Sequence, residues 1–400
     1  MVTTLAGTYG AGLYGAGPYA GRVPRPFVPF TSPGAYGITT DLWRADRYGT
    51  LLSRVDPLLV EAGDVVFNED ATPKRTLSIG VNDPYAFAPF HDWLVPVVTI
   101  SDPEGNAVTA RQGLYLVTPP ATSAEPSGVT GTVQGKDGTQ LLLLATRDDA
   151  VIPAGTDRGA FARQLALETG FALDQVLIPD TGVVQPEDRR WDAGTSVYQI
   201  MTDLLTGSNH YAPWADANGR LRTAPYRPLT ELAPVWTYTN ATEADALDLE
   251  GAIAESPDWQ RLGNVVTVRK LGHGTEPSYV AIRRNTNPLS PVSIVSLGYE
   301  MALPPVDFAD ATGETPEAIQ AALDAHADAL LSEAASHYRK LTVPVFPALD
   351  ADAHQVVGLE ITHGARQTYT GRWWRTGWTL HLDGANTSMT QSLSRVEMWA

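Results

Sequence analysis

Short apolar runs separated by turn residues dominate the chain between residues 31 and 147. The strongest is Trp93–Ile100, and a second run alternates so that Leu114 and Leu116 fall on one face. Strands this short and frequent, bounded by Gly, Pro and Asp, are typical of a β-barrel or sandwich. The pattern therefore predicts a first β-barrel over residues 31–147, and the apolar run Leu141–Leu144 is expected to belong to its strands.

Helical spacing follows in residues 148–228, most clearly after Trp191. Ser196 and Gln199 fit a capping box, in which each side chain accepts a hydrogen bond from the other residue's backbone N–H. Asn218-Gly219 is the preferred centre of a two-residue hairpin turn, because both positions tolerate positive φ. We therefore predict an α+β linking domain over residues 148–228, in which these five residues are structural. The apolar stripe of its helix is Val197, Ile200, Met201, Leu204 and Leu205.

Strands return after this domain, and one long helix interrupts them. Residues 229–305 are expected to form the first part of a second β-barrel, 306–340 a helical insertion, and 341–400 the closing part of the barrel. In the insertion we expect Thr315 at the N-cap and Pro316 at the first helical position. This order indicates two barrels related by duplication. The strand-like runs of the first part are Asn264–Arg269, Tyr279–Arg283 and Val292–Leu297.

Residues 1–30 form a segment of their own, an extended N-terminal arm rich in Gly, Ala and Pro. Such a composition does not build a core. Tyr9, Tyr14 and Tyr19 recur at intervals of five residues, and each pairs an apolar ring with a polar tip. The segment is either a disordered tail or an arm that lies over a neighbouring subunit with these tyrosines as contacts.

Composition narrows the class of protein further. The 400 residues are 43% hydrophobic, enough for sizeable cores, and there is no Cys, which excludes disulfides and thiolate metal sites. The net charge of -17 makes a freely accessible nucleic-acid-binding face unexpected, because phosphate binding needs clustered Lys and Arg. No secretory signal and no apolar run long enough to span a membrane is present, so no stable membrane insertion is expected.

Sequence patterns typical of catalysis or ion binding are weak. Residues 131–136 resemble a phosphate loop, but their spacing is wrong and Asp137 stands where Ser or Thr should bind magnesium. Asp216 to Gly219 resembles the start of a calcium loop, but its Gly comes too early. His326 and His337 share a helix stripe three turns apart, which is too far for one metal ion. We therefore expect no catalytic residue, no cofactor and no metal site.

Acidic and aromatic residues leave two alternatives open. Asp148-Asp149 and Glu187-Asp188 are adjacent acids of the kind usually found in solvated loops, yet a cell-wall hydrolase needs only one carboxylate pair across a cleft. Trp373, Trp374 and Trp378 could stack against sugars in a receptor-binding module, although a strand setting favours the core or a subunit contact.

The chain resembles the tail-hub or baseplate-hub family of tailed bacteriophages, and within it the minor tail proteins of actinophages. That family includes the N-terminal region of siphophage tail-associated proteins and the late-control-type hubs of contractile tails. The resemblance covers residues 31–400. It lies in the segments Phe161–Gly170, Arg190–Ser196, Asp216–Arg222, Asn264–Val268, Val343–Leu349 and Val356–Leu359.

This resemblance implies a mainly β fold with α+β parts, in which two hub-type β-barrels flank α+β domains. It implies a structural, non-enzymatic protein of the virion, made in the host cytoplasm and assembled at the distal tail. The expected assembly is a homotrimeric ring that adapts the sixfold tail tube to the threefold tail tip and lets DNA pass. Its expected partners are the distal tail protein, the tape measure protein and other tail-tip proteins.

Two features depart from the family pattern. Family members usually have a Gly-Asp-Val turn in the last barrel, where this chain has Asp350–His354. They also often continue into a peptidase, lysozyme or fibre domain, which we do not expect in this chain.

Overall fold

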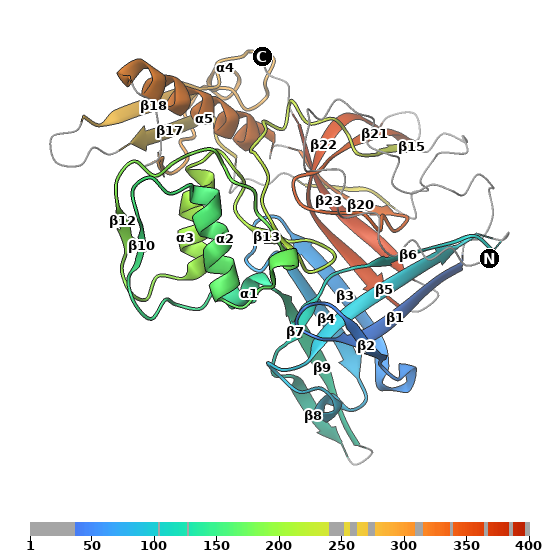
Figure 1. Cartoon of the computed structure of the whole chain (residues 1–400). Helices are drawn as coiled ribbons and strands as arrows, with labels where there is room; N and C mark the ends of the chain where they lie inside the picture. Colours follow the sequence, from blue (N-terminus) through green and yellow to red (C-terminus); the bar gives the residue numbers. More distant parts are fainter. Residues whose placement is uncertain are drawn as a thin grey trace.

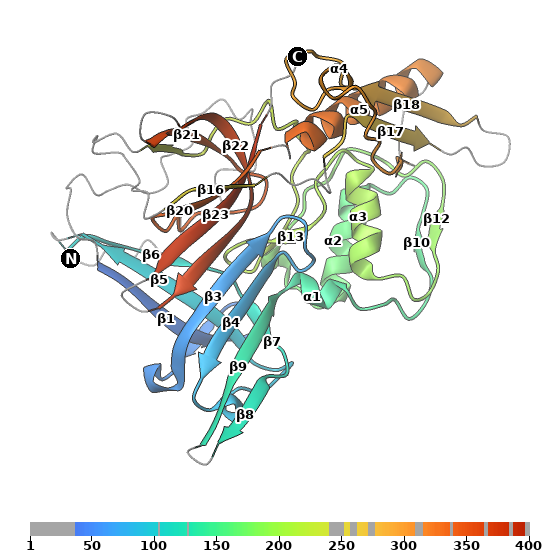
Figure 2. The ribbon, with the colours of Figure 1, turned by 180° about the vertical axis from the view of Figure 1, so that it is seen from behind.

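The computed structural model describes residues 37–102, 105–125, 128–239, 252–256, 262–270, 277–308, 315–336, 339–363, 367–383 and 387–396. Strands dominate these residues, which confirms the mainly β class with α+β parts. Figures 1 and 2 show three parts: a large curved sheet, a helical module beside it, and a third unit around the longest helix.

The large sheet has 15 strands and contains strands from both ends of the described chain. Its main path runs in the order β16-β20-β23-β22-β3-β4-β9-β7-β5-β1-β2, with β15, β21, β6 and β8 paired at its flanks. Its strands are β1 (Gly37–Ala45), β2 (Leu51–Arg54), β3 (Val60–Asn68), β4 (Arg75–Val81), β5 (Trp93–Ser101), β6 (Ala107–Arg111), β7 (Tyr115–Val117), β8 (Ala121–Glu125), β9 (Gly128–Asp137), β15 (Thr237–Thr239), β16 (Ala254–Ser256), β20 (Lys340–Val345), β21 (Val356–His363), β22 (Gln367–Leu382) and β23 (Ser388–Arg395).

The strands expected in two barrels share this one sheet and, in the described residues, do not close as separate barrels. The long strand β22 pairs with β21 along its first part and with β3 over Gly377–Leu382. A register shift against β23 lies between Arg375 and Gly377, as at a β-bulge. A Cβ at Gly377 would lie 2.9 Å from the carbonyl oxygen of Phe67, so the absent side chain lets β3 approach. The bulged strand β22, which changes partners along its length, thus joins the N-terminal and C-terminal strands of the large sheet.

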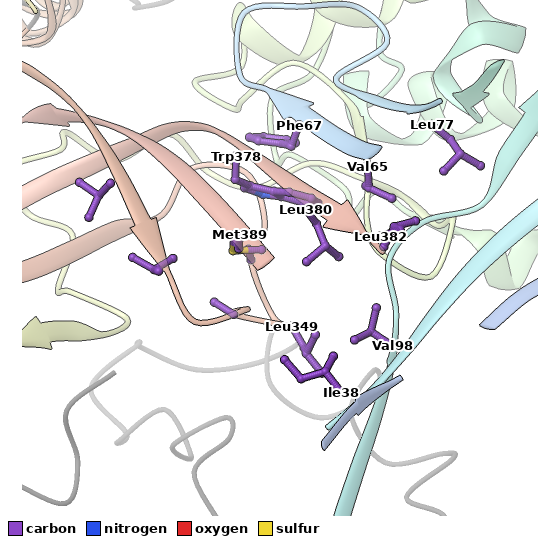
Figure 3. Close-up of a cluster of buried hydrophobic side chains, with 14 of the residues drawn as sticks. Ile38, Val65, Phe67, Leu77, Val98, Leu349, Trp378, Leu380, Leu382 and Met389 are labelled. Carbon is purple, nitrogen blue, oxygen red and sulfur yellow. The ribbon is translucent and has the colours of Figure 1, made fainter. Parts of the chain in front are cut away.

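The main hydrophobic core lies between the inner faces of the curved sheet. Along β4 every second residue is buried and those between are half-buried, as expected for a strand with one face in a core. Figure 3 shows Leu77 of β4 close to Val65 and, across the core, Trp378 beside Phe67. Met389 of β23 belongs to the same buried cluster. Strands from both ends of the chain therefore build one core.

The helical module has a second, separate core. Helices α2 and α3 pack against each other, and the buried cluster around them draws its residues from 142–221 alone. Its elements are α1 (Thr139–Leu142), β10 (Ala150–Ile152), α2 (Arg158–Glu168), η3 (Leu173–Gln175), β11 (Val176–Leu177), β12 (Arg189–Trp191), α3 (Val197–Thr206), β13 (Trp214–Ala215) and β14 (Leu221–Arg222). Two short 3-10 helices, η1 (Pro57–Leu59) and η2 (Pro84–Ala86), lie in the loops of the large sheet.

The strand expected at Leu141–Leu144 is wrong, because this run begins in the short helix α1. Asp137 accepts a hydrogen bond from the backbone N–H of Thr139 at 2.9 Å, which turns the chain into the helix. Leu142 is fully buried and Leu144 is 62% exposed, so the run does not lie in a core as a strand would. A short apolar run is compatible with both states, and tertiary packing decides between them.

The third unit, residues 262–336, combines a three-stranded sheet in the order β18-β17-β19 with the long helix α5. Its strands were expected in the second barrel, but in the described residues they pair only with one another and pack on α5. The strand expected at Val292–Leu297 is also wrong: Ser293 caps a single helical turn that ends at Gly298, where φ is +79°. The elements are β17 (Val265–Lys270), β18 (Tyr279–Arg284), α4 (Ile294–Leu297), β19 (Val306–Asp307) and α5 (Pro316–Ser336).

The start of α5 confirms its predicted cap. Thr315 Oγ1 accepts a hydrogen bond from the backbone N–H of Ala318 at 3.3 Å, and Pro316 is the first helical residue. Within the described part of the chain, no helix has both the length and the apolar character needed to cross a membrane.

Candidate functional site

The predicted structural residues Trp191, Ser196 and Gln199 lie together at the start of α3. Ser196 is the N-cap, and its Oγ accepts a hydrogen bond from the backbone N–H of Gln199 at 3.2 Å. The reciprocal half of the capping box is wrong, because the structure shows no hydrogen bond from the N–H of Ser196 to the side-chain oxygen of Gln199. The amide nitrogen of Gln199 donates to Asp203 at 2.7 Å. Trp191 is buried, and its indole N–H donates to the same Asp203 at 3.0 Å. Asp203 therefore ties the helix to β12.

Asn218 and Gly219 lie in a hairpin between β13 and β14, but the turn is not the expected two-residue type. Gly219 has φ +79° and Asn218 does not have positive φ. Asp216 and Arg220 pair through the backbone, so the loop holds three residues and ends in a left-handed Gly. The Asp216 carboxylate organises the loop by accepting the backbone N–H groups of Asn218 and Arg220 at 2.9 and 3.0 Å. It also pairs with the guanidinium of Arg220, which argues against the calcium-loop interpretation.

This hairpin is one of the places where the helical module meets the large sheet; Gly170 and Gln175, which exchange hydrogen bonds with Arg47, form another. A Cβ at Gly219 would lie 2.6 Å from Cβ of Leu114, so the turn packs directly on the start of β7. On β13, the strand that precedes the turn, the carbonyl oxygen of Ala215 accepts a hydrogen bond from Arg75 Nε at 3.2 Å. The predicted module therefore reaches the sheet through its hairpin, whereas Trp191 packs inside the module's own core.

Arg75 is the centre of a buried polar junction that joins β4, β13 and the segment 348–355. Its side chain is 0% exposed and pairs with Asp352 through Nη2 and Oδ1 at 2.9 Å. The same nitrogen donates to the carbonyl oxygen of Ala351 at 3.1 Å. The guanidinium lies 5.1 Å from the ring centroid of Trp378 and 5.4 Å from that of Phe67, a cation–π arrangement. One residue thus connects three segments distant in the sequence.

A second buried ion pair lies next to Arg75, between Glu69 and Lys74. Lys74 Nζ lies 2.7 Å from Glu69 Oε1, and His354 Nδ1 lies 3.2 Å from the same oxygen. Burial opposes ionisation of Glu69, but the contacts with His354 and Lys74 outweigh it and hold the pKa of this carboxyl below its ordinary value. The pair fixes the loop between β3 and β4 against the segment that carries His354.

The ring of His354 is enclosed by aromatic residues of the hairpin segment. It stacks on Tyr211 with centroids 3.6 Å apart and meets the edge of Trp214 at 4.9 Å. Burial lowers the pKa of His354 to about 4, so the ring is neutral at pH 7. Its Nε2 is buried without a hydrogen-bond partner, and an added proton there would have no acceptor.

A third polar group, around Arg375 of β22, extends the junction across the sheet. Arg375 is fully buried and donates to the side-chain oxygens of Gln355 and, at 3.2 Å, of Gln391. Gln391 in turn donates to the hydroxyl of Tyr238 on β15 at 2.7 Å. Asp350 lies nearby and accepts the indole N–H of Trp236, and burial raises its pKa.

The junction ties together segments that lie far apart in the sequence. Its charged groups have their partners inside the protein. A cavity of about 200 Å³ lies elsewhere, between β1 and β3, where Thr40, Leu42 and Ile79 contribute to its wall. Across the described residues no cluster of His, Asp and Glu has the geometry of a metal site.

The other candidate chemical residues have structural positions. Residues 131–136 lie within strand β9, so they form no phosphate loop. Asp149 pairs with Arg190, and Asp188 accepts the backbone N–H of Ala154 at 2.7 Å. His326 stacks on Phe308 with centroids 4.6 Å apart. All three tryptophans of β22 considered for sugar stacking are buried, as the core interpretation predicts: Trp373, Trp374 and Trp378. Tyr9, Tyr14, Tyr19 and His337 lie outside the described residues.

The sequence patterns did not lead us to predict the buried junction, although the position of Arg75 in its strand pointed to it. Arg75 occupies the same face of β4 as Leu77 and Ile79, so an alternating strand placed a charge at an inward position. Such a residue needs a buried partner. That partner is Asp352, which lies in the segment Asp350–His354, where this chain differs from the family pattern.

Comparison with family models gives no match, and comparison with curated protein sequences gives none either. Solved structures do match the fold. A tail protein from Neisseria meningitidis MC58 is 16% identical with a TM-score of 0.57, over 92% of this chain and 98% of that one. The 43 kDa tail protein of prophage MuSo2 from Shewanella oneidensis is 11% identical with a TM-score of 0.57, over 90% and 100%.

The chain has the fold of phage tail proteins. A third structure, the prophage tail protein gp18 from Listeria monocytogenes EGD-e, is 9% identical with a TM-score of 0.50, over 89% of this chain and 94% of its own. With identities of 9–16% and high coverage on both sides, the likeness is one of fold.

Proposed function

We propose that the chain is a structural tail protein of a bacteriophage and forms the hub of the distal tail. The observation that carries the proposal is the fold shared with phage tail proteins over 92% of this chain and 98% of the Neisseria protein. The buried junction supports it, because Arg75, Glu69 and His354 join distant segments into one rigid body. A tail protein transmits mechanical load and needs such rigidity more than it needs an active site.

The proposed assembly is a homotrimeric ring. Each chain contributes an N-terminal and a C-terminal half of the large sheet, joined where β3 pairs with β22. Three chains then present six sheet halves, which suits a threefold tail tip placed under a sixfold tail tube. The distal tail protein, the tape measure protein and other tail-tip proteins are the proposed neighbours.

The mass of the purified protein in solution tests the ring directly. Light scattering should give three times the chain mass of 43.0 kDa. A monomer or dimer at virion-like concentrations, together with the absence of a threefold ring in virion images, would refute the hub. A trimer located elsewhere in the virion would keep the structural role and refute the distal position.

We further propose that the ring lets DNA pass without binding it. The net charge of -17 disfavours contact with phosphates, since like charges repel. In an image of the assembled ring, Asp and Glu should outnumber Lys and Arg on the lumen wall. A lumen lined by Lys and Arg would contradict this part of the proposal alone.

The N-terminal arm is proposed to contact a neighbouring tail subunit through Tyr9, Tyr14 and Tyr19. Deleting residues 1–25 should leave the circular dichroism spectrum unchanged and weaken assembly with tail neighbours. A matched variant with all three tyrosines changed to Ala keeps the length of the arm and should weaken assembly equally. Unchanged assembly in both variants would show that the segment is a tail without this role.

A further inference from the structure

The third unit, residues 262–336, has its own hydrophobic clusters. Leu323 and Ala327 of α5 pack on Val266, Val268 and Ala281 of the three-stranded sheet. A smaller cluster combines Leu262, Val292 and Ala335. Neither cluster contains a buried residue from the large sheet or the helical module. The unit therefore folds around its own apolar interior, as a separable body does.

Both chain connections to this unit leave the large sheet at the same place. β16 ends at Ser256, before the unit, and β20 begins at Lys340, after it. These two residues are register partners in the antiparallel β16–β20 pair. An insertion attached by two adjacent strand ends can rotate about that attachment unless other contacts prevent it.

A row of five rings, which we call the ring ladder, spans the contact between the unit and the rest of the protein. Phe308 and His326 belong to the unit and stack with centroids 4.6 Å apart. His326 meets the ring of Tyr226 at 6.4 Å, and Tyr226 meets Tyr211 at 5.2 Å. Tyr211 stacks on His354 of the junction at 3.6 Å. The ladder thus runs from α5 to the buried ion pairs of the large sheet.

Each side of the ladder is firmly held by its own part of the protein. The N–H of Tyr211 donates to Ala224 at 2.9 Å and that of Tyr226 to Asn209 at 2.8 Å, so both tyrosines sit on a hydrogen-bonded hairpin segment. In the unit, the N–H of Phe308 donates to Arg269 of β17 at 2.8 Å. The step between Tyr226 and His326 therefore joins two rigid pieces and is the place where they can separate.

Glu333 adds an electrostatic contribution at the same contact. It lies two turns after His326 on α5, and its negative charge adds to burial in raising the pKa of Tyr211 to about 12. Burial and the same charge also raise the pKa of Tyr226. Glu333 of α5 therefore lies within electrostatic range of both tyrosines across the same contact.

We propose that residues 262–336 form a hinged unit, attached at the β16–β20 pair and latched to the rest of the chain by the ring ladder. Opening the latch turns the unit about its attachment and leaves its own fold and the large sheet intact. This goes beyond the tail-hub proposal and does not depend on it, because the test needs only the isolated chain.

The chain contains no Cys, so two introduced cysteines can carry spin labels without background. Ala325→Cys places one label on the exposed side of α5, and Thr370→Cys places the other on an exposed position of β22. In this background Tyr226→Ala should at least double the width of the measured distance distribution. Tyr299→Ala, an exposed tyrosine of the unit outside the ladder, is the matched control and should leave the width unchanged.

Amide hydrogen exchange gives a second readout. Opening of the latch leaves the hydrogen bonds of the hairpin segment in place, so the amides of residues 211 and 226 should keep their exchange rates in Tyr226→Ala while the distance distribution widens. Amides inside α5 should keep their rates, because its core stays intact.

Two results would overturn the hinge. One is an unchanged distance distribution in Tyr226→Ala and in the milder variant Tyr226→Leu. The other is a single cooperative loss of all structure by circular dichroism in both variants, which would show that the unit has no independent stability.

Discussion

Replacing Arg75 with Met should strongly destabilise the large sheet. Met keeps an apolar stem between Trp378 and Phe67 but removes the charge paired with Asp352 and the donors to Ala215 and Ala351. Removing one partner of a buried ion pair costs about 3–5 kcal/mol. The Asp352 side chain is 22% exposed and water can solvate it in part, so we expect about 3 kcal/mol.

A double-mutant cycle separates the ion pair from the packing. Asp352→Asn alone should cost about 1–2 kcal/mol, because the amide still accepts a hydrogen bond. Arg75→Met in that background should cost about 1–2 kcal/mol less than in the wild type, since no unpaired carboxylate remains. Arg54→Met is the surface control: that arginine is 52% exposed and pairs with Asp41, so its loss should cost less than about 1 kcal/mol.

Urea unfolding followed by tryptophan fluorescence measures these differences. The chain has ten tryptophans, and Trp373 and Trp378 are buried in the large sheet, so the fluorescence signal includes the core in which the substitution is made. The described residues form several separate hydrophobic clusters, so the comparison should use the midpoint of this transition and not one global free energy. A loss below about 1 kcal/mol for Arg75→Met, equal to that of the surface control, would refute the view that Arg75 joins the segments.

Three further predictions concern His354, Gly219 and Ser196. His354 has a pKa of about 4 in the folded chain, below its ordinary value of 6.5. The unfolded chain therefore binds the proton first, and stability should fall by up to about 3 kcal/mol as the pH drops from 6.5 towards 4. In His354→Asn, where Asn tolerates the φ of +56°, the melting temperature should fall less over this pH range than in the wild type. An equal fall in the two proteins would show that His354 does not cause this pH dependence. Gly219→Ala should cost about 1–3 kcal/mol in urea, because it adds a collision with Leu114 to the strain of positive φ. Gly194→Ala, at φ +94° in open space, should cost only about 1 kcal/mol. Equal costs for Gly219→Ala and Gly194→Ala would show that the collision with Leu114 does not contribute. Ser196→Ala should cost about 1 kcal/mol and speed amide exchange at Gln199, while Ser196→Asp should restore both; exchange unchanged in the Ala variant would argue against the cap.

Local features of the helical module were predictable because their causes are local. The apolar stripe of α3 follows from its helical period, and Ser196 caps the helix through a residue three positions away. The hairpin at Asn218-Gly219 was placed correctly, yet its turn type was wrong. The carboxylate of Asp216 holds a three-residue loop there, and a dipeptide preference does not include that contact.

Features that depend on distant segments were not predictable in the same way. The pairing of β3 with β22 joins positions such as Phe67 and Trp378, and local propensity says nothing about which strands meet. Strands 265–270 and 279–284 were recognised as strands, but their place under α5 and outside the large sheet depended on packing. The same holds for the run at Leu141–Leu144, where burial of Leu142 and exposure of Leu144 accompany the helical state.

The sequence by itself determined the mainly β class, the positions of α3 and α5, their caps, and the lack of a recognisable catalytic pattern. Each of these follows from periodicity or from hydrogen bonds within a few residues. Only the tertiary structure decided that both ends of the chain share one sheet and that Arg75 meets Asp352. The free energy of such contacts depends on register and burial, which exist only once segments far apart in the sequence have come together.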